Sequence, residues 1–319
     1  MKFAFILDQL EVIKTNKDSS YAMICEAASR NHQIFVMHQK DLVCKDDKVI
    51  GFTRPLKLID KTSQDKHWYQ TGDVIATPLY EFDAVFMRKD PPFDMEYVYS
   101  TYLLELAERQ GAYVINSPRS IRDHNEKMAI TKYPQFITST LITRQEDLLR
   151  KFLTEHHDII LKPLDGMGGA SVFRVHDSDH NISVILETMT HYETRSIMAQ
   201  RYIPEIAQGD KRIILIAGKA VPYSLARIPK SGETRGNLAA GGTGITQPLT
   251  KRDKEIAETL GPELYCQGLM LVGLDVIGEF LTEINVTSPT GMQEINNQAG
   301  FNVAKMMIDA VEQQVSLLS

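Results

Sequence analysis

A lysine followed directly by a glycine-rich stretch is the first feature of this sequence that can do chemistry. Lys162 ends the apolar run 159–162, and the next nine residues read PLDGMGGAS. Glycines let successive backbone N–H groups approach and surround phosphate oxygens. The stretch is not a Walker A loop, and a strand pattern at 172–175 follows it instead of a helix. We therefore predict a flap between two strands that closes over phosphates; the alternative is a plain tight hairpin.

Two carboxylates and an amide have the spacing of a metal site. Asp275 falls in one apolar run, and Glu283 and Asn285 fall in the next. Residues two apart on a strand face the same side. A hairpin turning through 278–280 pairs residue 277 with 281 and 275 with 283, so the two carboxylates stand opposite each other. They repel unless a cation lies between them, and with an amide oxygen they suit Mg²⁺. The alternative is a solvated pair on an exposed sheet face.

Three arginines could bind an anion. Arg212 follows Asp-Lys, Arg227 ends a predicted strand, and Arg235 lies in the stretch 228–246, which holds five glycines and shows no periodicity. Guanidinium groups suit bidentate binding of phosphate or carboxylate. A long stretch of this kind inside a compact domain is typical of a functional lid. Spacing alone does not show whether the arginines converge, and a single arginine is most often a surface charge.

Length, composition and net charge exclude several classes of protein. The chain has 319 residues, 43% of them hydrophobic, and a net charge of −6, so we expect about two globular domains and no sequence-independent nucleic-acid binding. The three cysteines, Cys25, Cys44 and Cys266, form neither a disulfide framework nor a zinc motif. No run approaches 18 apolar residues, so no membrane span is expected. We expect a cytoplasmic enzyme.

The first part of the chain alternates strand and helix patterns. Strands are predicted at 2–7, 33–38, 84–87 and 113–116, with helices at 21–30, where Asp18, Ser19 and Ser20 offer N-cap chemistry, and at 95–106. Alternation of this kind indicates crossover units and a mostly parallel sheet. We therefore predict an α/β, doubly wound parallel-sheet domain over residues 1–123.

The second part has a different pattern. Strands are predicted at 159–162, 172–175 and 197–201, and hairpins at 213–216 with 221–227 and at 270–277 with 281–286. Helices are predicted to end near 157 and to span 183–189, 251–267 and 302–317. Together with the glycine flap and the acidic pair, these elements indicate phosphate, magnesium, a lid and an anionic substrate. Such chemistry needs charge neutralisation and positioning more than an acid–base dyad.

The sequence resembles the bacterial glutathione synthetase family of ATP-grasp ligases over nearly its whole length. The segments that carry the resemblance are MRKDPPFD (87–94), NEK (125–127), LKPLDGMGGAS (161–171), GDKR (209–212), ARIP (226–229), GETRGNLAAGG (232–242), GLD (273–275) and LTEINVTSPTG (281–291). GETRGNLAAGG and EINVTSPTG are specific to this enzyme type. Lys-Pro before a glycine loop is shared by many ATP-grasp proteins. Arg201 departs from the small polar residue expected in the adenine segment.

The resemblance implies an ATP-grasp fold preceded by the N-terminal domain, and ATP-dependent joining of γ-glutamylcysteine to glycine through an acyl phosphate. It implies three domains: 1–123 for substrate, 124–203 as the central lid domain, and 204–319 as the catalytic domain with a mobile loop at 228–243. It further implies Mg²⁺ or Mn²⁺, ATP as co-substrate, no nucleic-acid or membrane partner, and a homotetramer.

Site residues follow from the same resemblance. The residues expected to bind ATP are Lys127, Lys162, Gly166, Met167, Gly168, Gly169, Gln200, Tyr202, Ile203 and Asp210. Asp275, Glu283 and Asn285 are expected to bind the metal, and Arg212, Arg227 and Arg235 to stabilise the anionic substrate and acyl phosphate. Asp18, Ser19 and Arg88 are the expected contacts to substrate in the N-terminal domain.

Other readings remain open. A different ATP-grasp carboxylate–amine ligase, such as a D-alanine or glutamate ligase, would differ in its amine substrate. A nucleotide-binding regulatory protein would need neither three metal positions nor a long lid. A Rossmann dehydrogenase is disfavoured because no G-x-G-x-x-G follows the first predicted strand.

Overall fold

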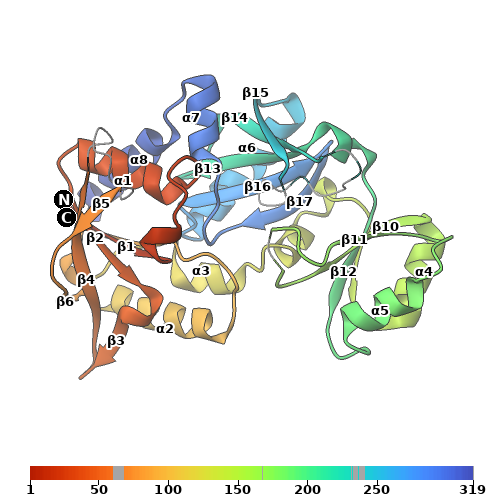
Figure 1. The fold of residues 1–319 in the computed structure, drawn as a ribbon, viewed down its shortest axis with the longest axis horizontal. Helices are drawn as coiled ribbons and strands as arrows, with labels where there is room; N and C mark the ends of the chain where they lie inside the picture. Colours follow the sequence, from red (N-terminus) through yellow and green to blue (C-terminus); the bar gives the residue numbers. More distant parts are fainter. Residues whose placement is uncertain (60–67, 167, 231, 233–235, 237–240, 319) are drawn as a thin grey trace.

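Three β-sheets organise the chain in this computed structural model, which describes residues 1–59, 68–166, 168–230, 232, 236 and 241–318. Figure 1 shows the N-terminal sheet at one end, the small sheet made of β9–β12 at the other, and the sheet of β13–β17 between and above them. The described helices include none that is long and apolar enough to cross a lipid bilayer.

The centre of the N-terminal sheet is parallel, as the alternating pattern predicted. Strands β1 (Lys2–Leu7), β2 (Gln33–His38), β7 (Ala84–Met87) and β8 (Val114–Ile115) lie in the order β2-β1-β7-β8. Helices α1 (Ser19–Ser29), α2 (Met95–Arg109) and α3 (Pro118–Asp123) follow in the connections. Asp18, one of the three residues expected to cap it, caps α1 by accepting from the Tyr21 backbone N–H at 2.8 Å, so the helix begins at Ser19 and not at the predicted residue 21.

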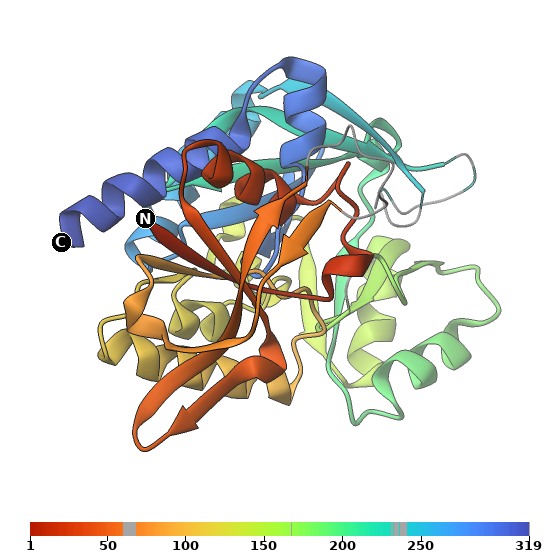
Figure 2. The same ribbon diagram turned by 60° about the vertical axis from the view of Figure 1, so that its left-hand side comes forward.

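An antiparallel extension of this sheet was not predicted. Strands β3 (Leu42–Lys45), β4 (Lys48–Leu58), β5 (Tyr69–Thr71) and β6 (Ile75–Pro78) join it through β4, which pairs with β2. Figure 2 brings this extension to the front. The Lys, Gly and Pro residues of β4 break the apolar alternation by which a strand is recognised, and pairing with β2 supplies the stabilisation that the local pattern does not show.

The small sheet holds the glycine flap. Its order is β11-β10-β12-β9, formed by β9 (Thr140–Thr143), β10 (Asp158–Pro163), β11 (Phe173–His176) and β12 (Ile197–Arg201), all antiparallel. Helices α4 (Glu146–His156) and α5 (Ile182–Thr190) pack on it around a core that includes Leu149, Leu161 and Leu186. The glycine stretch therefore joins two antiparallel strands, as predicted.

The third sheet has the order β15-β14-β13-β16-β17. Its strands are β13 (Asp210–Ile216), β14 (Lys219–Ile228), β15 (Thr243–Pro248), β16 (Leu271–Ile277) and β17 (Phe280–Asn285). The prediction of a structureless stretch through residue 246 was wrong at its end, because β15 pairs with β14 from Thr243 onward. Glycine and proline within TGITQP hide that strand from a pattern search.

Helices close the structure around this sheet. They are α6 (Lys251–Cys266), α7 (Met292–Ala299) and α8 (Val303–Leu318). The sequence pattern did not show helix α7. Its N-cap residue is Gly291, which provides no side-chain hydrogen bond to the first turn. Helix α8 packs on α1, and one apolar core joins residues of β1 and α1 to β13 and α8. The described residues also form six short 3-10 segments: Leu10–Val12, Gln39–Asp41, Leu79–Glu81, Met128–Lys132, Pro134–Phe136 and Pro204–Gln208.

Candidate active site

A cavity of about 350 Å³ is lined by residues from both the flap sheet and the third sheet, together with the loop after β7. Thirteen of the residues expected at the site contribute to its wall: Lys127, Lys162, Gly166, Gly168, Gly169, Gln200, Tyr202, Ile203, Asp210, Arg212, Arg227, Glu283 and Asn285. Residues as far apart in sequence as Asp90 and Thr290 therefore meet around one space. Met167 and Arg235 lie outside the described residues.

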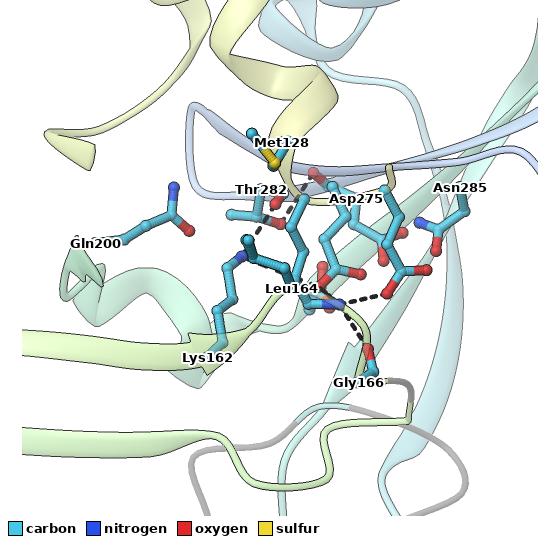
Figure 3. A network of polar contacts seen from close by, with 12 residues as sticks. Met128, Lys162, Leu164, Gly166, Gln200, Asp275, Thr282 and Asn285 are labelled. Carbon is cyan, nitrogen blue, oxygen red and sulfur yellow. Dashed lines mark hydrogen bonds and ion pairs between the residues drawn. The ribbon is translucent and has the colours of Figure 1, made fainter. Parts of the chain in front are cut away.

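Two buried lysines reach this cavity from different elements. Lys127 Nζ donates to the Gly166 carbonyl at 2.6 Å and to the Glu126 carboxylate, and lies 3.7 Å from Glu283 Oε1. Lys162, at the end of β10, donates to the Thr282 carbonyl at 3.1 Å, as Figure 3 shows. Two cations at one point of a cavity suit an anionic ligand with several oxygens.

The surroundings of these lysines affect their pKa values in opposite directions. Burial lowers the pKa of Lys162, and Glu283 only partly offsets this. Burial also acts to lower the pKa of Lys127, but the charges of Glu283 and Glu126 outweigh it and raise that pKa above its usual value. The positive charge of Lys127 is therefore stabilised by neighbouring carboxylates, whereas the positive charge of Lys162 is not fully balanced by its neighbours. A bound polyanion would supply that charge.

The glycine flap spans the residues between β10 and β11. Gly168 and Gly169 have positive φ angles of 63° and 78°, which a side chain rarely adopts. The Asn125 side-chain amide donates to the Leu164 carbonyl at 2.9 Å, and Lys127 holds Gly166, so two residues of the NEK segment fix the base of the flap. The start of the flap is thereby held beside Lys127.

The hairpin of β16 and β17 brings the predicted acidic pair together, by a register that differs from the prediction. Ile277 pairs with Phe280, not with residue 281, because the turn has two residues with Gly278 at a φ of +58°. The ladder then slips by one residue at Thr282, and this bulge restores the pairing of Asp275 with Glu283. The displaced Thr282 carbonyl is the group that accepts from Lys162.

Asp275 and Glu283 nevertheless have different partners. Asp275 is 2% exposed and accepts from Arg212, with Nη2 3.0 Å from Oδ2, and from Arg227, whose Nη2 lies 2.8 Å from the same oxygen. Although burial opposes it, these two guanidinium groups hold the pKa of Asp275 well below its usual range. Arg227 also binds Asp210, whose pKa burial raises. Two arginines of the predicted three therefore converge, and they converge on carboxylates.

The donor set at the end of this hairpin fits a hard divalent cation. Glu283 and Asn285 line the cavity, and the Asn285 side-chain N–H donates to the Gly273 carbonyl at 3.2 Å, which leaves the amide oxygen as the atom to bind a cation. Mg²⁺ is commonly held by one or two carboxylates together with substrate phosphates and water. Among the described residues no group of three or more His, Cys, Asp or Glu side chains forms a metal site, so phosphate oxygens would have to complete the shell.

The other end of the cavity is more apolar. Ile160 and Ile203 line it beside Tyr202, and the Arg174 guanidinium lies 3.7 Å from the Tyr202 ring centre while it pairs with Asp158. Gln200, which is 4% exposed, donates to Thr140 Oγ1 at 2.9 Å. A flat apolar slot with amide groups at its edge suits a heterocyclic base. Arg201 also lines this end and donates to Thr138.

The three expected substrate contacts of the N-terminal domain lie outside the cavity wall. Asp18 caps α1, and Ser19 accepts from the Met292 backbone N–H at 3.3 Å. Arg88 is 5% exposed and donates to Ser20 Oγ and, at 3.0 Å, to the carbonyl of Pro289, a residue of the cavity wall. Its Nη1 has no partner among the described residues.

Sequence reasoning did not select several residues of the wall. Asp90, Glu126 and residues 287–290 line the cavity but were not expected as site residues. All of them lie inside segments that carry the family resemblance, namely MRKDPPFD, NEK and LTEINVTSPTG. Residues 287–290 show no periodicity, so only the topology reveals that they reach the cavity.

Two models of protein families match the chain. Residues 1–122 match the model of the prokaryotic glutathione synthetase N-terminal domain, and residues 126–300 match that of the prokaryotic glutathione synthetase ATP-grasp domain. The chain belongs to the prokaryotic glutathione synthetase family. The resemblance stated from its motifs is confirmed, as is the α/β fold class.

Relatives and solved structures agree with this assignment. The chain is 67% identical to the glutathione synthetase of Nitrosomonas europaea over 99% of both chains, and 51% identical to that of Pseudomonas aeruginosa, again over 99% of both. The crystal structure of the D-cycloserine synthetase DcsG has a TM-score of 0.68 at 12% identity, with 99% of this chain and 100% of that one covered. At such low identity the structural likeness shows the fold alone. The chain is an ATP-dependent ligase.

Proposed function

We propose that this ligase joins γ-glutamylcysteine to glycine and releases glutathione, ADP and phosphate. The observation that carries the proposal is the meeting of Lys127, Lys162 and Glu283 in one cavity that also has an apolar slot. In the first step the cysteinyl carboxylate attacks the γ-phosphorus of ATP, and ADP leaves. In the second the glycine amine attacks the acyl carbon, phosphate leaves, and the amine loses its proton.

The nucleotide occupies the slot and the flap. Tyr202, Ile203 and Gln200 hold the base, Lys127 and Lys162 hold phosphate oxygens, and Asp210 lies near the nucleotide. The flap backbone at Gly166, Met167, Gly168 and Gly169 covers the phosphates. These assignments are supported by the convergence of the described members on one cavity and by the ability of preorganised N–H groups to stabilise charge that develops in the transition state.

The metal end supports the phosphoryl transfer. Glu283 and Asn285 would hold Mg²⁺ or Mn²⁺ against the phosphates, with Asp275 as a third candidate. When bound, the ion neutralises phosphate charge and orients the γ-phosphoryl group for in-line attack. Arg212 and Arg227 lie beside this position and stabilise the acyl phosphate together with Arg235.

The remaining assignments follow from the family. Arg88, with Asp18 and Ser19 near it at the start of α1, contributes to the donor-substrate subsite. Residues 228–243 act as the lid that excludes water, which would hydrolyse the acyl phosphate. The domain limits at 123/124 and 203/204, the cytoplasmic location and the homotetramer stay predictions; light scattering of the purified chain tests the last.

The test of the proposed function is the substrate requirement for ADP release. ADP should form only when γ-glutamylcysteine, glycine and Mg²⁺ are present together, and chelation of the metal should stop it. ATP turnover that ignores the dipeptide would contradict the proposal. ADP release is also measured with D-alanine or glutamate in place of the proposed substrates. Turnover with either one would favour the corresponding alternative ATP-grasp ligase.

A further inference from the structure

The loop after β7 contributes Asp90 and Pro91 to the cavity wall and follows the carboxyl end of a central strand of the N-terminal sheet. Strands β1 and β7 are parallel neighbours, and the chain leaves β1 toward β2 on one side and β7 toward β8 on the other. In open α/β sheets such a switch of direction creates a crevice at the carboxyl ends of the strands, where ligands bind. Asp8 follows β1 there, and Arg88, Lys89 and Asp90 follow β7.

This loop is held firmly by β1. The Asp90 backbone N–H donates to Asp8 Oδ2 at 2.9 Å, and Lys89 Nζ lies 2.8 Å from Asp8 Oδ1. Lys89 Nζ also donates to the backbone carbonyl of Asp90 at 2.7 Å. These contacts use the backbone of Asp90 and leave its side chain to line the cavity.

Asp90 differs from the other carboxylates of the cavity wall. Glu126 pairs with Lys127, Asp210 pairs with Arg227, and Glu283 lies within 4.0 Å of both lysines. Asp90 has no lysine, arginine or histidine nitrogen within ion-pair distance in the described part of the chain, and its carboxylate is hydrogen-bonded by Ser288. Asp90, an exposed residue, is thus the one carboxylate of the wall that forms no ion pair among the described residues, although the charge of Arg88 acts on it.

We propose that the Asp90 carboxylate binds the ammonium of an α-amino-acid head group at the substrate end of the cavity, and thereby selects the γ-glutamyl donor. Arg88, two residues earlier, is not part of the cavity wall, but it supplies a buried positive charge that acts on Asp90 and whose Nη1 is unpartnered among the described residues. A carboxylate and a guanidinium close together match the opposite charges of such a head group. This inference rests on the proposed function.

The neighbours of Asp90 favour the donor over glycine as the source of the ammonium. The groups that interact with its carboxylate are Ser288, Arg88, Asp8 and Asp18, and none of them belongs to the phosphate or metal end. Glycine must reach the acyl phosphate at that end. The γ-glutamyl head group lies at the far end of a dipeptide, which spans about 7 Å or more when extended, so its ammonium is remote from the reacting carboxylate.

Donor selectivity in an isosteric variant tests the proposal. The kcat/KM for γ-glutamylcysteine is compared with that for N-glutarylcysteine, which lacks only the α-amino group, in the wild type and in Asp90→Asn. The wild type should prefer the natural donor by about 10- to 100-fold, the range for a hydrogen bond to a charged group. Asp90→Asn should reduce this preference to about threefold or less, mainly through KM, because the head group is remote from the reacting carboxylate.

Two controls accompany the comparison. Asp83→Asn removes an exposed carboxylate at the opposite end of β7 and should keep the wild-type preference. Asp90→Glu should restore part of the preference, which a merely structural role would not do. Calorimetric titration of both donors into each variant, with ADP and Mg²⁺ present, measures the same selectivity without turnover.

Each other outcome counts against the proposal. An unchanged donor preference in Asp90→Asn overturns it, even if both donors react more slowly. A raised KM for glycine with an unchanged donor preference assigns the ammonium to the amine substrate and overturns the choice of donor. Failure of the wild type to turn over γ-glutamylcysteine at all would instead contradict the proposed function, so the two failures are distinguishable.

Discussion

Asp275 and Glu283 stand opposite each other across the ladder of β16 and β17, yet only Glu283 lines the cavity. Asp275 is held between Arg212 and Arg227, whereas Glu283 lies between the two lysines at distances of 3.7 and 4.0 Å. One register therefore produces two sites: a buried carboxylate that fixes two arginines, and an accessible carboxylate beside the lysines.

Replacing Glu283 by Gln should lower the magnesium-dependent rate about 100-fold, equivalent to ~3 kcal/mol of lost charge stabilisation. The amide keeps the shape but cannot neutralise a divalent cation. The measurement is ADP release as a function of Mg²⁺ concentration. Glu279→Gln, in the exposed turn of the same hairpin, serves as control and should behave as wild type. A wild-type rate in Glu283→Gln would remove Glu283 from the metal site.

Replacing Lys162 by Met should raise the KM for ATP about 10- to 100-fold, the effect of losing a hydrogen bond to a charged phosphate. The melting temperature without ATP should fall by no more than about 3 °C, ~1 kcal/mol for a chain of this size, because burial already disfavours the charged lysine and lowers its pKa. Lys219→Met, at an exposed position of β14, is the matched control. An unfolded variant, or an unchanged KM, contradicts the assignment.

Replacing Asp275 by Asn should destabilise the protein by about 3 kcal/mol at pH 7, because it leaves two buried guanidinium groups without their charge partner. Chemical denaturation in the absence of metal and nucleotide measures this loss. Asp309→Asn removes a carboxylate that is 48% exposed from its ion pair with Arg30 and should cost less than about 1 kcal/mol. Equal stability of the two variants would show that the arginines do not depend on Asp275.

Local patterns predicted the parts of the fold that have strong periodicity. The parallel strands β1, β2, β7 and β8 and the pair β16–β17 lie where their apolar runs indicated. The antiparallel strand β4 and strand β15 were missed because their stability comes from pairing with β2 and β14 and not from their own composition.

The candidate site shows the same limit. Spacing placed Asp275 opposite Glu283, although the bulge at Thr282 that produces this pairing is not visible in the sequence. Spacing did not indicate which carboxylate the arginines bind, because Arg212 and Arg227 approach Asp275 from neighbouring strands whose register depends on the whole sheet. Asp90 lies inside the segment MRKDPPFD, but only the structure shows that its carboxylate lines the cavity without an ion pair to any described residue.

Stability should depend on pH through Glu108 on α2. Burial and the charge of Glu105 raise the pKa of Glu108 to about 7. The stability that goes with this raised pKa is fully present below the unfolded value near 4.5 and is lost as the pH rises through 7. Glu108→Gln does not undergo this loss. The melting temperature of the variant minus that of the wild type should therefore increase between pH 5 and pH 8, as thermal unfolding at both values measures.

Glu96→Gln, in the exposed first turn of the same helix, should show no such increase, because its carboxylate interacts favourably with the helix N-terminus. A difference for Glu108→Gln that is flat or falls over this range would show that the carboxyl is not desolvated in the folded protein.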